Sequence, residues 1–201
     1  MPPLALLVVT VAAWAAAAQL DMMNTRPTVF FPGWVAMMAA MMLPSVAPLV
    51  LLYRQRGRLR LVLGYLLVWA AAGIPVYALA ETLGLMGVPA AVVALVLAAA
   101  GGYQFTPLKA ACLRTCRSPL DFLALRWGLG PLRLGIDHGL WCLGCCWALM
   151  AVVVVAAAMN LVIAAMIAMV ICAEKLLPAG HWTARATGAA LLAGALLRIV
   201  V

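Results

Sequence analysis

Residues 33–53 read GWVAMMAAMMLPSVAPLVLLY, a run of 21 residues without a charged side chain. A helix needs about 20 mostly apolar residues to cross the hydrocarbon core of a bilayer. The run therefore predicts a membrane-spanning helix, bent in its second half by Pro44 and Pro48. Four arginines follow it within seven residues, and such a basic flank is typical of the cytoplasmic end of a span.

The whole chain has the composition of a membrane protein. Of its 201 residues 69% are apolar and only 9% are charged, against about 45–50% and about 25% in soluble domains. This composition excludes a soluble enzyme and a disordered tail. We therefore predict an all-α transmembrane bundle of six to seven spans, forming a single integral membrane domain over residues 1–201. The candidate spans are 4–20, 33–53, 59–80, 88–108, 132–157, 159–177 and 183–201.

Whether the first candidate span is retained decides between six and seven spans. No Lys or Arg precedes its apolar run, as the basic start of a signal peptide would require. We therefore interpret 4–20 as a retained helix. A cleaved first segment would leave six spans and the same sides for the remaining loops.

Basic residues lie mostly on one side of this predicted bundle. Eleven of the 13 lie in the segments after the second, fourth and sixth spans. By the positive-inside rule that side is cytoplasmic, which places the N-terminus in the cytoplasm and the protein in the cytoplasmic (inner) membrane. The net charge of +8 would suggest nucleic acid on a soluble chain. Because these charges lie in short loops, we expect the lipid bilayer as a partner and no nucleic acid.

The stretch 101–131 interrupts the apolar pattern with glycines and prolines. Proline removes a backbone donor and ends or kinks a helix, so we predict a broken or interfacial segment after the fourth span. Broken segments line the binding sites of many transporters. The alternative is a plain cytoplasmic connection with an interfacial helix.

The strongest candidate site lies in the span 132–157, which carries His138, Cys142, Cys145, Cys146 and Met150. On a helix, the first three share a narrow stripe of one face. Thiolate, thioether and imidazole groups suit Cu(I), and Cys with His also suits zinc. We predict a metal site here, copper first and zinc as the alternative. The competing interpretation is that the cysteines are small apolar packing residues.

Cys112 and Cys116 form a second pair, spaced so that both face the same way if the segment is helical. They lie at a similar predicted depth to Cys142 and could complete the same site. The alternatives are packing and a disulfide, although the reducing cytoplasmic side argues against the disulfide.

Three further groups contain weaker candidates. Met37 and Met41 belong to a methionine face of the span 33–53, where spacing alone favours core packing. Met159 begins the span 159–177 and is another soft donor. Glu174, near the inner end of that span, is either a functional carboxylate or an interfacial one paired with Lys109 or an arginine.

Taken together, these motifs resemble a bacterial family of predicted metal-binding integral membrane proteins, long a domain of unknown function. The matching motifs are W-x-x-M-x-x-A-M-M-x-P-S from Trp34, Y-Q-x-x-P-L-K-x-x-C-L-x-x-C-R-x-P from Tyr103, H-G-x-x-C-x-G-C-C-W-x-L-M from His138, Met159-Asn160-Leu161 and Glu174-Lys175. One departure is Ala158, where the family pattern has glycine. The resemblance implies a metal-linked membrane role without a settled reaction, and it favours Met37, Met41 and Glu174 as additional ligands.

The leading hypothesis is a membrane protein that binds copper and delivers, stores or transfers it to a soluble or membrane protein partner. Cys142, Cys145 and Cys112 would be thiolate ligands, with His138 or Cys116 completing the shell. The first alternative is a copper-dependent membrane oxidase or monooxygenase, or a subunit of one. The second is a structural membrane subunit whose cysteines only pack.

Overall fold

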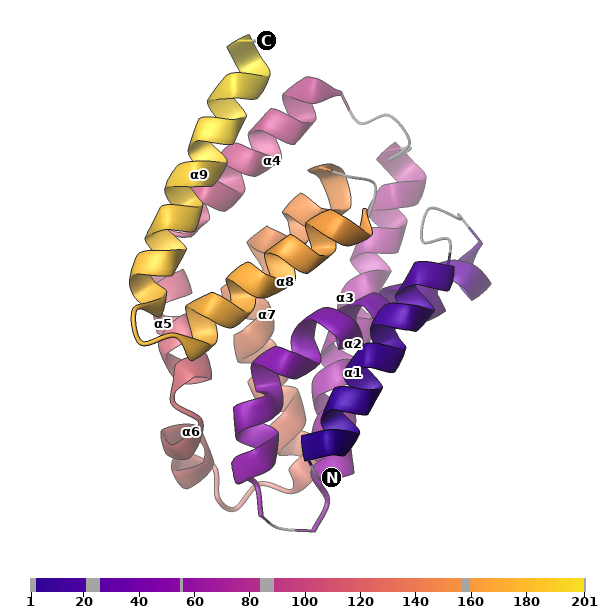
Figure 1. Cartoon of the computed structure of the whole chain (residues 1–201), viewed down its shortest axis with the longest axis vertical. Coiled ribbons are helices and arrows are strands. Elements are labelled where there is room, and N and C mark those ends of the chain that lie inside the picture. Colours follow the sequence, from indigo (N-terminus) through magenta and orange to yellow (C-terminus); the bar gives the residue numbers. More distant parts are fainter. Residues whose placement is uncertain (1–2, 21–25, 55, 84–88, 157–159, 201) are drawn as a thin grey trace.

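The computed structural model describes residues 3–20, 26–54, 56–83, 89–156 and 160–200. Within these ranges the chain folds into nine helices without a strand (Figure 1), which confirms the all-α prediction. Seven of the helices coincide with the seven predicted apolar runs, and α5 and α6 form the segment after the fourth run. The helices are α1 (Pro3–Gln19), α2 (Pro27–Leu52), α3 (Arg58–Leu83), α4 (Ala90–Tyr103), α5 (Pro107–Arg117), α6 (Pro119–Leu125), α7 (Pro131–Ala156), α8 (Leu161–Leu176) and α9 (Gly180–Val200).

The structure does not support six to seven spans. Among the described residues, α2, α3 and α7 are long and apolar enough to cross a membrane, and the bent pair of α4 and α5 would make a fourth. Two of the predicted runs, 88–108 and 159–177, are longer than the helices α4 and α8 that they contain. α8, for example, has 16 residues because Asn160 caps its start and Leu177 ends it, whereas a span needs about 20.

α2 passes through the core of the molecule. Its methionines at positions 37, 38, 41 and 42 are all at most 1% exposed. The indole nitrogen of Trp34 donates a hydrogen bond of 2.8 Å to the carbonyl oxygen of Trp69 on α3. α1 packs along α2 on the side that faces the viewer in Figure 1.

α3 and α7 form the closest helix pair. A Cβ atom at Gly135 of α7 would lie 2.0 Å from the carbonyl oxygen of Leu61, and one at Gly64 of α3 would lie 2.2 Å from that of Leu132. The two backbones therefore meet directly, as small residues permit. This contact fixes the start of α7, before the turns that carry the cysteines of the candidate site.

The broken segment after α4 turns α5 back along α7. The axes of α4 and α5 differ by 66°, and Thr106 caps α5 by accepting a hydrogen bond of 3.2 Å from the backbone N–H of Lys109. The buried residues of α5 are Lys109, Cys112, Leu113 and Cys116. The segment therefore contributes side chains to the interior and is not a plain interfacial connection.

Candidate metal centre

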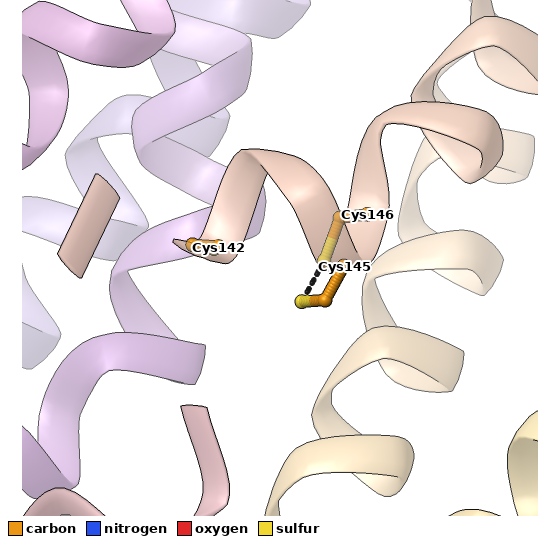
Figure 2. A group of neighbouring side chains, drawn as sticks. All are labelled: Cys142, Cys145 and Cys146. Carbon is orange, nitrogen blue, oxygen red and sulfur yellow. Dashed lines mark hydrogen bonds between the residues drawn. The ribbon is translucent and has the colours of Figure 1, made fainter. Parts of the chain in front are cut away.

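Three thiols form the centre of the candidate site. The sulfur atoms of Cys142, Cys145 and Cys146 all lie within 4.8 Å of one another, and those of Cys145 and Cys146 are 3.1 Å apart. Figure 2 shows the side chains of Cys145 and Cys146 turned toward each other, with Cys142 one turn earlier on α7. Each cysteine is at most 1% exposed. The sequence prediction that α7 gathers several thiols therefore matches the geometry.

α5 adds a fourth thiol to this group. The sulfur of Cys116 lies 3.8 Å from that of Cys145. We call Cys116, Cys142, Cys145 and Cys146 the thiol cluster. Cys112 lies one turn earlier on α5, against Gly144, where a Cβ atom would be 2.8 Å from its sulfur. The geometry thus favours Cys116 over Cys112 as the partner of the α7 thiols, and a ligand role for Cys112 stays a prediction.

A buried lysine and a tyrosine contact the cluster at Cys142. The ammonium of Lys175 on α8 lies 2.8 Å from the Cys142 sulfur and donates to the Ser45 hydroxyl at 3.2 Å. The hydroxyl of Tyr65 on α3 lies 3.0 Å from the same sulfur. Lys175 is only 6% exposed, and a buried cation needs a negative partner. The arrangement therefore suits a thiolate at Cys142.

A buried ion pair supports the cluster from the other side. Lys109 donates to Glu174 at 2.6 Å, with both side chains 1% exposed. The same ammonium also donates to the backbone carbonyl of Cys145 at 2.6 Å, and Gln104 donates to Glu174 at 3.2 Å. The structure shows Glu174 paired with Lys109, and a ligand role for Glu174 stays a prediction. This network ties α4, α5 and α8 to the turn of α7 that carries the thiols.

His138 lies one turn before Cys142 and is 3% exposed. Its ring packs edge-on against Phe122 of α6, with centroids 4.9 Å apart, and lies 6.0 Å from the ring of Tyr65. Its Nδ1 atom is buried without a hydrogen-bond partner among the described residues. A buried polar atom without a partner is rare in native structures, so His138 offers a free donor nitrogen close to the thiols.

The family model described as copper chaperone matches residues 31–198. The chain belongs to the PpoB2 copper chaperone family. The matched range includes every residue of the thiol cluster. Comparison with curated proteins and with solved structures finds no match.

The donors of this copper chaperone family member fit a soft metal ion. Thiolates and a neutral imidazole suit Cu(I), and the same set accepts zinc. Family membership and the three-cysteine group together support metal binding, with copper as the metal that the family description names.

The methionines lie apart from the contacts described above. Met37 and Met41 are fully buried in the core on α2. Met150 lines a separate apolar cavity of about 600 Å³ together with Trp34 and Trp147. Met159 lies outside the described residues. Metal binding by any of these methionines stays a prediction.

Sequence reasoning missed the contacts that Lys175, Ser45 and Tyr65 make with the cluster. For Lys175 the sequence contained a signal, because a lysine in an apolar helix is usually paired with another group. The sequence alone did not identify Cys142 as that partner. No sequence signal distinguishes Tyr65 from an ordinary core tyrosine, since its role depends on the register between α3 and α7.

Proposed function

We propose that this chain is an integral membrane copper chaperone that holds Cu(I) in the thiol cluster and passes it to a protein partner. The observation that carries the proposal is the convergence of four buried thiols from α5 and α7 in a chain of a copper chaperone family. Copper is the cargo in this proposal.

The spacing of the sulfurs suits transfer by ligand exchange. Separations of 3.1 Å and 3.8 Å between neighbouring sulfurs allow one sulfur to approach a bound ion before another leaves. Neighbouring donors of equal softness keep such steps close in energy. The cluster therefore suits holding and release of copper. The oxidase alternative needs an open position with harder ligands, which no contact in the described site favours.

The charge around the cluster favours a monovalent cargo held by two thiolates. Cu(I) with two thiolates carries one net negative charge, and the Lys175 ammonium beside Cys142 would neutralise it. Lys109 and Glu174 already neutralise each other. Buried charges are stable only when they are paired, so this arrangement meets the electrostatic requirement of an anionic Cu(I) site.

The proposed location is the cytoplasmic membrane, with the N-terminus in the cytoplasm. In Figure 1, α1, α2, α3, the pair α4–α5, α7, α8 and α9 alternate in direction along the long axis. The turn between α2 and α3, helix α6 and the start of α7 lie at one end, and this end carries most of the arginines of the loops. Such an asymmetry supports a cytoplasmic assignment for that end.

Metal analysis of the purified protein tests the proposed function. The wild type is loaded with Cu(I) under reducing, oxygen-free conditions, and bound metals are counted by mass spectrometry. We expect near-stoichiometric copper, lost in Cys142→Ser/Cys145→Ser and retained in Cys172→Ser. Cys172 is the matched control because it is a free, partly buried cysteine on α8, outside the cluster.

Two outcomes would contradict the proposal. Copper absent from the wild type after loading would leave the cysteines as packing residues. Zinc retained in preference to copper, and lost in the double variant, would keep the site but replace the cargo. An assay for the transfer of bound copper to an acceptor protein then distinguishes a chaperone, which passes the metal on, from a storage protein, which keeps it.

A further inference from the structure

A small cavity borders the thiol cluster. It has a volume of about 180 Å³ and is bordered by residues of α2, α5, α7 and α8, with Cys116, His138 and Lys175 among them. Such a volume exceeds the roughly 30 Å³ that one water molecule occupies in the liquid. Leu176, which is 50% exposed, also lines it. The cavity therefore connects a surface residue with members of the candidate site.

We infer that this cavity is the exchange port for copper, with Cys116 and His138 as the first protein ligands that the metal meets. The inference rests on the proposed function and adds the route and the order of ligands. The metal would pass from the port to Cys116, then to Cys145 and on to the remaining thiols.

The exposure of the four thiols supports this order. Cys142, Cys145 and Cys146 are at most 1% exposed and do not line the cavity, whereas Cys116 is 8% exposed and does. Cys116 lies 3.8 Å from the sulfur of Cys145. Among the thiols of the cluster, Cys116 is thus both the accessible one and a direct neighbour of the buried ones.

His138 supplies the second observation. Its Nδ1 atom is buried and has no hydrogen-bond partner among the residues that the structure describes, and the residue lines the port. A buried polar group without a hydrogen-bond partner destabilises the fold. A role as a transient metal ligand explains why a histidine occupies this position, where an apolar residue would avoid that penalty.

The charge of the port indicates the form in which copper arrives. Arg117 and Lys175 line it, so a bare cation is repelled while an anionic complex is attracted. Cu(I) prefers thiolates. The donor is therefore an anionic Cu(I)–thiolate species, which hands over its ion as Cys116 or His138 replaces one of its thiolates. The ion stays Cu(I), and the departing thiolate stays with the donor. Where Cys116 is the entering ligand, its thiol proton passes to that thiolate.

The larger apolar cavity is a poorer route. Its lining contains Met150 and Gly144 but no cysteine or histidine. Copper that entered there would have to pass the α7 backbone without a thiol or imidazole donor among the lining residues.

A variant with a larger side chain at the opening of the cavity tests whether this cavity is the exchange port. Leu176→Trp enlarges a residue that lines the cavity, and the matched control is Leu177→Trp, also 50% exposed but not part of the lining. The purified proteins receive Cu(I) as its cysteine complex without oxygen, and copper per chain is counted after timed desalting. We expect loading of Leu176→Trp to slow at least about tenfold, as access to the site narrows. Final stoichiometry should be unchanged, and Leu177→Trp should load at the wild-type rate.

A second variant tests the first ligands without blocking the cavity. His138→Leu should also load more slowly, because the arriving metal then meets one ligand fewer on its way to the thiol cluster. Equal rates for wild type, Leu176→Trp and His138→Leu would overturn the port. A wild type that binds no copper would overturn the proposed function itself, so the two failures are distinguishable.

Discussion

Lys175 brings a positive charge into the interior, and its ammonium contacts both Cys142 and Ser45. Neither of the ion pairs within the described ranges includes it. At the residue scale, the site is therefore an arrangement of charge as well as of sulfur. Three buried ionisable side chains, Lys109, Glu174 and Lys175, surround the thiols, and each has a contact that explains its burial.

Replacement of Lys175 by methionine should weaken copper binding. The variant removes the cation beside Cys142 while keeping a long apolar stem. A hydrogen bond to a charged group contributes about 1.5–3 kcal/mol, so we expect the Cu(I) dissociation constant to rise by about tenfold to a hundredfold. Competition with a Cu(I) chelator measures this dissociation constant, and Cys172→Ser is the control. An unchanged affinity would show that Lys175 does not compensate a thiolate.

The Lys109–Glu174 pair gives a separate prediction. Glu174→Gln leaves a buried ammonium without its counter-charge, which should destabilise the fold by about 3–5 kcal/mol. Lys109→Met/Glu174→Met removes both charges and should recover most of the stability, since apolar replacements of buried pairs are often neutral. Thermal unfolding in detergent measures both. The double variant should also keep its copper, and loss of copper there would show that the buried pair is needed for metal binding.

At the scale of the helices, the position of the thiols depends on contacts between α7 and its neighbours. The direct backbone contact with α3 sets the depth and rotation of α7. The 66° bend after α4 brings α5, and with it Cys116, to the same level. The two sets of thiols meet because both constraints hold at once.

Enlarging Gly135 should disturb this arrangement. An added Cβ atom would lie 2.0 Å from the carbonyl oxygen of Leu61, so Gly135→Ala must push α3 and α7 apart, at a cost of about 1–3 kcal/mol. Gly102→Ala is the control, because a Cβ atom there meets nothing within 4 Å. Unfolding temperature and copper affinity should fall in the first variant only. A Gly135→Ala protein as stable as the control would contradict the close packing.

Sequence periodicity was sufficient for some of these features and insufficient for others. The helical stripe of His138, Cys142 and Cys145 follows from local geometry alone, so their common face was predictable. The choice of Cys116 over Cys112 depends on the crossing of α5 with α7, which no local pattern encodes. The contact between Lys175 and Cys142 joins residues 33 positions apart, and it requires the packing of α8 to be known.

At the scale of the whole molecule, the apolar runs and the helices agree in number but differ in length. Among the described residues, seven runs correspond to seven helices or helix pairs. Three helices there, or four spans with the bent pair, meet the length and composition of a span. Runs such as 159–177 overestimate the helix because apolar residues continue into its ends. Helices shorter than about 20 residues can cross only if the bilayer thins or the flanking side chains extend to the interface.

The side on which the N-terminus lies tests whether α1 crosses the membrane. With or without α1 as a span, the arginine-rich turn between α2 and α3 is cytoplasmic. If α1 crosses the membrane, the N-terminus is in the cytoplasm. If only α2, α3, α4–α5 and α7 cross, the N-terminus lies outside, and the C-terminus is outside in either topology.

We expect a fluorescent protein that matures only in the cytoplasm to be bright when fused to the N-terminus and dark when fused to the C-terminus. A reporter active only outside should give the reverse pattern. An N-terminus found outside would remove α1 from the spans and leave an even number of them, with the arginine-rich turn still cytoplasmic.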